Sequence, residues 1–368
     1  MRTIRSFSTA AALLLSVILL PGAGQVMAIT PELPFWEDFE PTDGGWGYQQ
    51  EWQACERYGG DPYCPNDPLL PLCRYPVECS AKYGPLKFES WPDAANGGKV
   101  YSGLRSGRQP IWDPYWGAIL HPFRHPSGLG DLRLKLWQYD FASILCDCDP
   151  WGPPSRPNFD VHGWLVLTNP YRTEYYVLAV NTKQSWTHLA WATKTDGWHV
   201  SSTPRATGWR KMEILVHPYS GNVGDVEFLV NDEVIAQGRR DPGGCHGQQV
   251  NWLRLGGDPA LLPESHLTNT FEEFWYDEVE LTFNPLGCFD PSMDFDGDCD
   301  VDQEDFGLFQ LCLTGSDDPE GLFNPLYCHC MDADDDNDVD QDDFGVFQAC
   351  ASGPGVTADT SCDDPPPP

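Results

Sequence analysis

The chain has 368 residues and a formal net charge of −33, from 55 acidic residues against 22 Lys and Arg. This length indicates two domains, or one large β domain with a small module. The acidic balance excludes nucleic acid and anionic membrane as partners, because both require a basic surface. From Pro285 onward there are 22 acidic residues and no Lys or Arg, so the charge is concentrated at the C-terminal end.

Residues 1–28 have the pattern of a secretory signal peptide. Arg2 and Arg5 precede an apolar run from Ala11 to Leu20, and Val26-Met-Ala28 offers a small-residue cleavage site. The run is too short for a membrane anchor, and no second stretch of sufficient length follows it. The sequence therefore predicts a secreted protein that is not a transmembrane protein.

Residues 29–284 have the features of a β domain throughout. Apolar and polar residues alternate from Leu132 to Tyr139, which is the period of a half-buried strand. Asn231-Asp232 predicts a two-residue hairpin turn. Similar strand candidates are Val161–Leu167, Tyr175–Val180, Trp186–Ala192, Trp209–Val216, Val226–Val230, Asn251–Leu255 and Phe274–Phe283. Many short strands separated by Pro and Gly predict a mainly β fold, a two-sheet jelly-roll sandwich.

The fourteen cysteines are typical of an oxidising compartment. A segment rich in Pro and Gly, residues 49–84, interrupts the strands and contains four of them, Cys55, Cys64, Cys73 and Cys79. We expect two local disulfides there, because the spacing lacks the paired CxxC motifs of a zinc site. Seven cysteines precede residue 280 and seven follow it, so either one bridge crosses between the halves or each half leaves a free thiol.

The most informative pattern occurs twice, 38 residues apart, within residues 285–350. Carboxylates stand at alternate positions, and an acid follows eleven residues after the first, which is the spacing of a twelve-residue Ca²⁺ loop. Val301 and Val339 occupy the eighth places, where an apolar residue holds such a loop to its neighbour. The predicted Ca²⁺ ligands are Asp294, Asp296, Asp298, the carbonyl of Asp300, Asp302 and Asp305, and then Asp332, Asp334, Asp336, the carbonyl of Asp338, Asp340 and Asp343. Residues 351–368, which end in four prolines, are expected to form a disordered tail.

This repeated unit resembles the dockerin modules of secreted bacterial proteins, in which each calcium loop is followed by one helix. The resemblance predicts helices after both loops, with Phe306, Phe309 and Leu313 on one face of the first. It implies an attachment function, with a cohesin-like protein as a possible partner. The sixth place of the loop, where Gly is usual, holds Cys299 or Asn337 instead.

Residues 34–283 resemble a concanavalin-A-like or laminin-G-like jelly roll. The resemblance rests on Phe35–Glu40, Thr207–Ile214 and Trp275–Leu281. It implies recognition of carbohydrate or another extracellular surface. It also makes Glu40 and Asp277 candidates for a structural calcium site that links the first and last strands.

Aromatic residues are abundant, with fifteen tryptophans and fourteen tyrosines. Aromatic faces hold sugars, and Trp112, Trp116 and Trp151 lie in loop-like sequence where they could form a sugar platform.

The sequence favours a non-catalytic protein. The hydrolase relatives of the jelly roll carry Glu-x-Asp-x-Glu, and this chain contains neither that motif nor Gly-x-Ser-x-Gly. Glu278 and Glu280 are the nearest alternate acids, in the expected closing strand. The leading hypothesis is a secreted calcium-binding recognition protein. The alternatives are a polysaccharide-degrading glycoside hydrolase with an appended dockerin, and a structural protein of the cell surface.

Overall fold

The computed structural model describes residues 33–37, 53–54, 87–89, 106–109, 119–140, 142, 163–181, 184–185, 187–243, 246–256, 274–318 and 321–364. The expected signal peptide, almost all of the Cys-rich segment, and Glu40, Trp112, Trp116 and Trp151 lie outside this range. The predictions for these residues therefore remain predictions.

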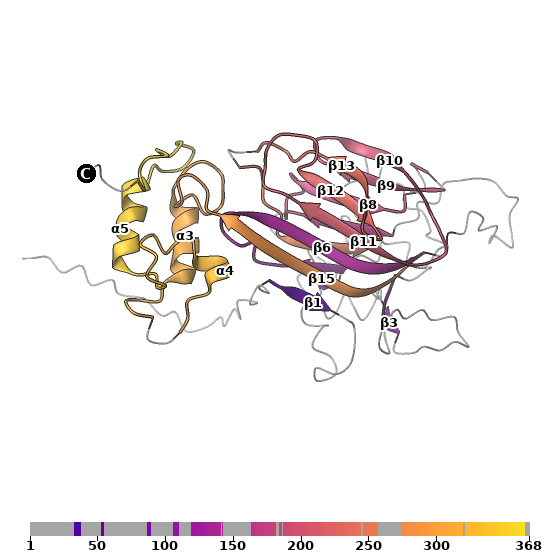
Figure 1. The fold of residues 1–368 in the computed structure, drawn as a ribbon, viewed down its shortest axis with the longest axis horizontal. Coiled ribbons are helices and arrows are strands. Elements are labelled where there is room, and N and C mark those ends of the chain that lie inside the picture. The colour runs from indigo at the N-terminus through magenta and orange to yellow at the C-terminus, as the bar shows by residue number, and fades with distance from the viewer. Residues whose placement is uncertain are drawn as a thin grey trace, which may run out of the picture. The chain divides into compact units, whose positions relative to one another are not determined.

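Two antiparallel sheets form a jelly-roll sandwich, as the sequence predicts (Figure 1). The first sheet has the order β13 (Glu233–Gly238), β12 (Val226–Val230), β11 (Gly208–Val216), β6 (Leu129–Asp140), β15 (Phe274–Gly287), β4 (Ser106–Gln109) and β3 (Lys87–Glu89), with β1 (Phe35–Glu37) also paired to β15. The second has the order β10 (Gly197–Pro204), β9 (His188–Thr193), β8 (Tyr175–Ala179), β7 (Trp164–Thr168), β14 (Trp252–Gly256), β5 (Ile119–Pro122) and β2 (Gln53–Ala54).

The core lies between the sheets and follows the alternation in the sequence. Leu132, Leu134 and Leu136 of β6 are buried, and Met212 and Ile214 of β11 pair with that strand and are buried with them. Because successive strand residues point to opposite faces, the residues between them lie on the outer face of the sheet. The predicted hairpin is confirmed, since Asn231 and Asp232 take φ values of 51° and 68° between β12 and β13.

Several strands have no counterpart among the strand predictions, namely β2, β3, β4, β5 and β10. β10 is an edge strand with a single buried residue, so it lacks the alternating apolar pattern. β5 has only four residues and ends at Pro122. The closing strand β15 is longer than predicted and continues to Gly287.

A small helical module follows β15. It contains α3 (Gln303–Cys312), α4 (Pro325–Cys328) and α5 (Gln341–Cys350). Phe306 and Phe309 of α3 pack on Phe344 and Phe347 of α5, with ring centroids 5.7–6.0 Å apart. Leu313 does not share this face. It follows the last residue of α3, and its side chain is 54% exposed.

Residues 351–364 differ from the disordered tail expected from their composition. A disulfide joins Cys350 to Cys362, Ala358 is buried, and its N–H donates to the carbonyl of Cys299 (2.9 Å). The composition argument fails here because hydrogen bonds and a disulfide, rather than apolar burial alone, hold this segment.

Helices in the described part of the chain are all too short or too polar to cross a membrane.

Candidate metal centre

Two groups of carboxylates form within the repeated loops, which we call loop 1 (residues 294–305) and loop 2 (residues 332–343). In loop 1, carboxylate oxygens of Asp294, Asp296 and Asp305 lie within 4.8 Å of one another, as do those of Asp300, Asp302 and Asp305. Loop 2 repeats both groups, with Asp332, Asp334 and Asp343 in one and Asp338, Asp340 and Asp343 in the other. In each loop, carboxylates from five of the six residues named as candidate ligands are therefore brought together, in two groups that share the twelfth acid. Asp298 and Asp336 belong to neither group, and each accepts a hydrogen bond from the backbone N–H two residues on (3.2 Å).

Each loop is wound around the carboxylate of its first residue. Asp294 accepts hydrogen bonds from the N–H groups of Gly297 (2.8 Å) and Cys299 (3.0 Å), and Asp332 accepts one from Asn337 (2.9 Å). The sixth residue must turn left-handed to allow this, and Cys299 and Asn337 have φ values of 86° and 69°. The sharp turn expected at this place is present although neither residue is Gly.

The twelfth residue fastens both ends of its loop. Asp305 accepts from Phe295 (2.7 Å) near the start of loop 1 and from Asp302 (2.8 Å), which is the N-cap of α3. Asp343 makes the equivalent pair of bonds with Ala333 and Asp340, both at 2.7 Å. Both acids complete capping boxes, so the residues that approach the metal position also start the helices.

Three carboxylates of loop 1 have strongly raised pKa values. Burial, with the neighbouring acids as a further cause, raises the pKa of Asp294 to about 6, that of Asp296 to about 8 and that of Asp305 to about 7. In loop 2, burial and neighbouring acids raise the pKa of Asp334 and Asp343 as well. Acids gathered in this way repel one another when ionised, and a bound cation removes that repulsion.

The seventh residues provide an independent indication of a cation. Asp300 and Asp338 are 6% and 3% exposed, and the Oδ1 atom of each is buried with no hydrogen-bond partner in the described structure. A buried carboxylate oxygen without a partner is costly. Both residues belong to groups of three acids, and oxygen-only ligand sets suit Ca²⁺, so the donor set fits this ion.

The two repeats are joined crosswise. The carbonyl of Val301 in loop 1 accepts hydrogen bonds from Ser352 and Gly353, which follow α5, and the carbonyl of Val339 in loop 2 accepts from Thr314 and Gly315, which follow α3. Hydroxyl groups repeat the pattern, since the Val301 N–H donates to Ser352 Oγ (3.0 Å) and the Val339 N–H to Thr314 Oγ1 (2.9 Å). We call this arrangement the crossed clasp. Each eighth residue therefore binds the segment after the other repeat's helix.

Disulfides close the module, and all of its cysteines are bonded. The bridges are Cys288–Cys330, Cys312–Cys328 and Cys350–Cys362. Cys299 is also disulfide-bonded, to a partner outside the described residues. The grouping of Cys288 and Cys330 with His329 is therefore not a metal site, because its two sulfurs are bonded to each other.

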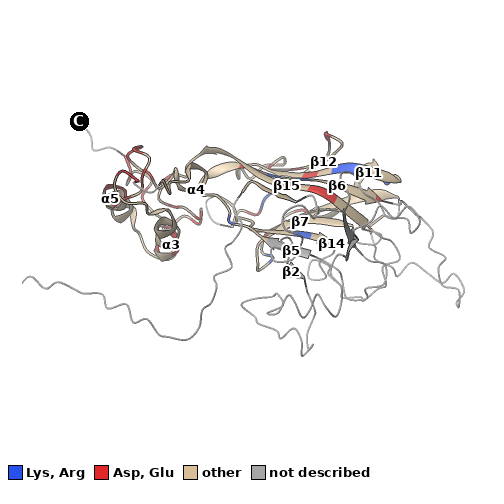
Figure 2. Ribbon diagram, turned by 90° about the horizontal axis from the view of Figure 1, so that it is seen from below, with Lys and Arg blue, Asp and Glu red and all other residues tan. Residues whose placement is uncertain are grey.

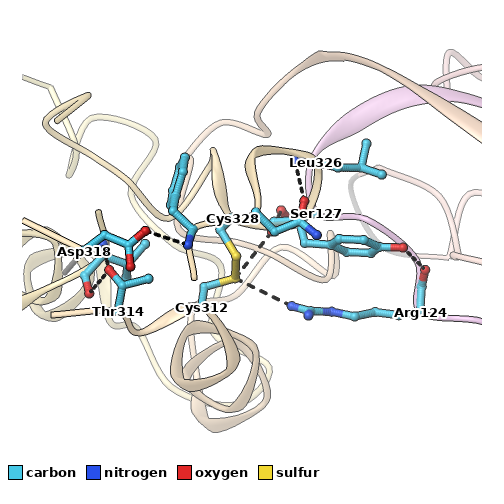
Figure 3. Close-up of a disulfide and its surroundings, with 11 residues drawn as sticks. Arg124, Ser127, Cys312, Thr314, Asp318, Leu326 and Cys328 are labelled. Atoms are coloured by element: carbon cyan, nitrogen blue, oxygen red, sulfur yellow. Dashed lines mark hydrogen bonds between the residues drawn. A yellow bond between two sulfur atoms is a disulfide. The ribbon is translucent and has the colours of Figure 1, made fainter. Parts of the chain in front are cut away.

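Side chains of the β domain hold the module near α4. Tyr327 is buried, and its hydroxyl accepts a hydrogen bond from the N–H of Leu33. Ser127 donates to the carbonyl of Tyr327 (2.8 Å), and the Arg124 guanidinium lies 4.7 Å from the Tyr327 ring centroid. Figure 3 shows Arg124 reaching Cys312 Sγ of the Cys312–Cys328 bridge, at 3.7 Å.

The three candidate acids of the closing strand, Asp277, Glu278 and Glu280, each have a defined place in β15. Asp277 is buried on the outer face of β15, opposite Trp137, and its Oδ1 accepts from the N–H of Glu278 (2.9 Å). A bulge separates Asp277 from Glu280, and Glu278 stands in it with φ 49°. Glu280 forms an ion pair with Lys135.

The outer face of the first sheet carries an aromatic residue that the sequence analysis does not select. Trp36 of β1 is 56% exposed and lies opposite Glu280 of β15. Tyr139 and Trp209 pair on the same face, edge to face with centroids 5.5 Å apart. The signal for Trp36 is its place next to Phe35, which is buried, because successive strand residues point to opposite faces. In Figure 2 the loops beside α3 and α5 are rich in Asp and Glu.

No family model matches the chain, and no curated protein matches it. Solved structures resemble it distantly. Domains LG4-5 of the mouse laminin alpha1 chain match at 14% identity and TM-score 0.30, over 46% of this chain and 42% of that one. Endo-beta-1,4-glucuronan lyase from the fungus Trichoderma reesei matches at 12% identity and a TM-score of 0.33, over 67% of this chain and 94% of that one. A mutant of alginate lyase Aly36B in complex with alginate tetrasaccharide matches at 8% identity and a TM-score of 0.33, over 64% of this chain and 98% of that one.

Proposed function

We propose that the chain is a secreted calcium-binding protein whose C-terminal module folds around two Ca²⁺ ions. The observation that carries the proposal is the repeated convergence of carboxylates in loops 1 and 2, each with a buried seventh-place oxygen that has no partner in the described structure. Three disulfides within the module support an oxidising, extracellular setting.

Calcium would stabilise the folded module as well as neutralise the repulsion between its carboxylates. The twelfth residues, Asp305 and Asp343, both face the metal position and cap the helices, so the ion and the start of each helix depend on the same side chains. Binding to the folded form alone stabilises it by mass action.

Titration calorimetry of the full chain tests this function. We expect two Ca²⁺ ions per chain, with affinities in the range of about 10⁻⁴–10⁻³ M that is typical of extracellular modules. Chelation should reduce helical circular dichroism and lower the melting temperature. A chain with the same helix content and melting temperature in EDTA and in calcium would contradict the proposal.

We propose that the jelly roll recognises carbohydrate or another extracellular surface. The exposed Trp36, together with the Lys135–Glu280 ion pair beside it, supports this proposal, because sugars bind aromatic faces flanked by charged and polar groups. The platform of Trp112, Trp116 and Trp151 stays part of the proposal.

A screen of the full chain against neutral and acidic polysaccharides tests this recognition. Trp36→Ala should weaken binding at least fivefold, whereas Tyr171→Ala, at another exposed aromatic residue of the domain, should leave it unchanged. Release of reducing ends from any polysaccharide would favour the hydrolase alternative instead.

We propose an attachment function for the module on the basis of its dockerin-like loops. The exposed part of loop 2, from Ala333 to Asn337, supports it, because these residues are accessible in the folded chain. A cohesin-like protein or an acid-binding extracellular surface would be the partner. Pull-down with the calcium-loaded chain, with a chelated sample as the control, measures this attachment.

A further inference from the structure

The two loops share their sequence pattern but not their burial. In loop 1, Asp294, Phe295 and Gly297 are buried. At the equivalent places of loop 2, Asp332 is buried, whereas Ala333 and Asp335 are exposed. The third places also differ, since Asp296 is half-buried and Asp334 is exposed. The metal position of loop 1 is therefore covered on a side where that of loop 2 is open.

His246 and Phe289 provide the cover over loop 1. Their rings stack with centroids 4.4 Å apart. His246 Nε2 lies 3.9 Å from Asp294 Oδ2, at the first ligand position. A Cβ atom added to Gly297 would lie 3.1 Å from the Phe289 ring and 3.4 Å from His246, so the loop backbone lies directly against this pair.

Little open space separates the cover from the β domain. A cavity of about 20 Å³ lies behind it, lined by His246 and Phe289 together with His125, Gly130 and Arg240. This volume is enough for about one water molecule. Exchange of an ion through this side therefore requires the cover to move.

Loop 1 cannot leave the cover by a movement of the whole module, because the module is fixed to the β domain elsewhere. Gly128 approaches so closely that an added Cβ would lie 2.6 Å from the Gly287 carbonyl and 2.8 Å from Cys330 Sγ. The Cys288–Cys330 bridge and the buried Tyr327 hold the same region. Opening loop 1 on this side therefore requires a local displacement of His246 or Phe289.

We infer that loop 1 retains its Ca²⁺ ion behind the His246–Phe289 cover, whereas loop 2 exchanges its ion with the solvent. The inference rests on the proposed calcium function, and it assigns different roles to two loops of the same spacing. Loop 1 is a structural site that joins the module to the β domain, and loop 2 is the site that responds to the calcium concentration. Asp300, whose buried Oδ1 has no partner in the described structure, is one of the acids gathered in loop 1.

Release of calcium from the loaded full chain into excess fluorescent chelator, followed by stopped flow, tests the inference. We expect two phases of one ion each, with the slow phase at least tenfold slower than the fast phase. Asp296→Asn should remove the slow phase, and Asp334→Asn at the equivalent place should remove the fast phase.

Variants of the cover provide the decisive comparison. Phe289→Leu and His246→Gln, which preserve much of the side-chain volume, should accelerate the slow phase at least threefold and leave the fast phase unchanged. Tyr171→Ala, at an exposed residue of the β domain, is the matched control and should change neither phase.

The outcomes separate the two proposals. A loaded chain that releases two ions in one phase, or a fast phase that responds to Phe289→Leu, would overturn the inference but leave the calcium function intact. A chain that releases no calcium, because none was bound, would overturn the proposed function itself.

Discussion

Loop 1 and loop 2 are two copies of one motif in different surroundings. In each, an acid at the twelfth place holds the start of the loop and the N-cap of the following helix. They differ in what lies outside the motif, since His246 and Phe289 cover loop 1, and the corresponding part of loop 2 is exposed. The comparison shows that the spacing of acids determines where the carboxylates gather, and that tertiary packing determines how accessible each group is.

The largest expected effect on calcium binding comes from the twelfth places. Asp305→Asn and Asp343→Asn should each remove one of the two calcium ions. Losing an ion present at a hundredfold excess over its Kd lowers the free energy of unfolding by about 2.7 kcal/mol. Asp305→Asn should cost more than Asp343→Asn, because Asp305 also accepts from Asp296. Thermal melting in saturating calcium measures both, and equal losses would mean that the loops are energetically equivalent.

Removal of the Cys350–Cys362 bridge should affect loop 1, and removal of the Cys312–Cys328 bridge should affect loop 2. Cys350 and Cys362 enclose the segment that binds Val301 of loop 1, whereas Cys312 and Cys328 enclose the segment that binds Val339 of loop 2. Replacing either pair by Ser should destabilise the chain by about 3 kcal/mol, as expected for closed loops of this size.

Calorimetry of the two double variants shows which calcium affinity falls. The Cys350→Ser, Cys362→Ser variant should weaken calcium binding to loop 1, and the Cys312→Ser, Cys328→Ser variant should weaken binding to loop 2. Weakening of the same loop by both changes would contradict the crossed clasp.

The metal-free chain should become more stable as the pH falls from 8 to 5. The folded pKa values of Asp294, Asp296 and Asp305, about 6, 8 and 7, exceed the ordinary value of 3.8, so the folded metal-free form takes up protons in this range before the unfolded form does. The stabilisation is complete below the unfolded pKa and is lost as the pH rises through the folded values. In EDTA, the melting temperature should therefore be about 5 °C higher at pH 5 than at pH 8. Saturating calcium should remove the part of this trend that comes from the loop acids, because it keeps their carboxylates ionised.

Three substitutions distinguish the contribution of the loops to this pH dependence from that of the rest of the chain. Asp296→Asn should flatten the EDTA profile more than Asp334→Asn. Glu174, a buried acid of the β domain, has a pKa raised by burial to about 7, and it contributes the same sign of pH dependence with or without calcium. Glu174→Gln should remove that common part from both profiles.

The smallest expected effects come from the hydroxyl groups of the crossed clasp. Ser352→Ala removes the acceptor for the Val301 N–H, and Thr314→Ala removes the acceptor for the Val339 N–H. Each change should cost about 1 kcal/mol, which is typical of one hydrogen bond. Ser352→Ala should weaken calcium binding to loop 1, and Thr314→Ala should weaken binding to loop 2, by a few-fold each in a calorimetric titration. A Ser361→Ala change, at an exposed residue of the tail, is the control.

Local patterns predicted those parts of the structure that depend on neighbouring residues. The alternation from Leu132 to Tyr139 predicted β6, and Asn231-Asp232 predicted a hairpin because both residues adopt positive φ at low cost. The spacing of acids brought Asp294, Asp296 and Asp305 together as expected. These features are decided within a few residues of one another.

Features that depend on contacts between distant residues could not be predicted from the sequence. Nothing in the composition of residues 351–364 indicates that Ala358 bonds to Cys299, since these residues are 59 positions apart. The i, i+3, i+7 pattern placed Leu313 in the helix interface, but α3 ends at Cys312 and the side chain is exposed. His246 carries no local signal at all, because its contact with Asp294 comes from the closure of the sandwich.

The crossed clasp has a consequence for how such a module can be moved between proteins. A chain cut after Cys350 would keep every acid of both loops, yet it would deprive Val301 of Ser352 and Gly353. A single repeat taken alone could satisfy its own eighth residue only by borrowing the trailing segment of another copy, which is the route to an exchanged dimer. The smallest portable unit is therefore the pair of repeats with the trailing segment up to Cys362, which must be grafted, duplicated or lost as one piece.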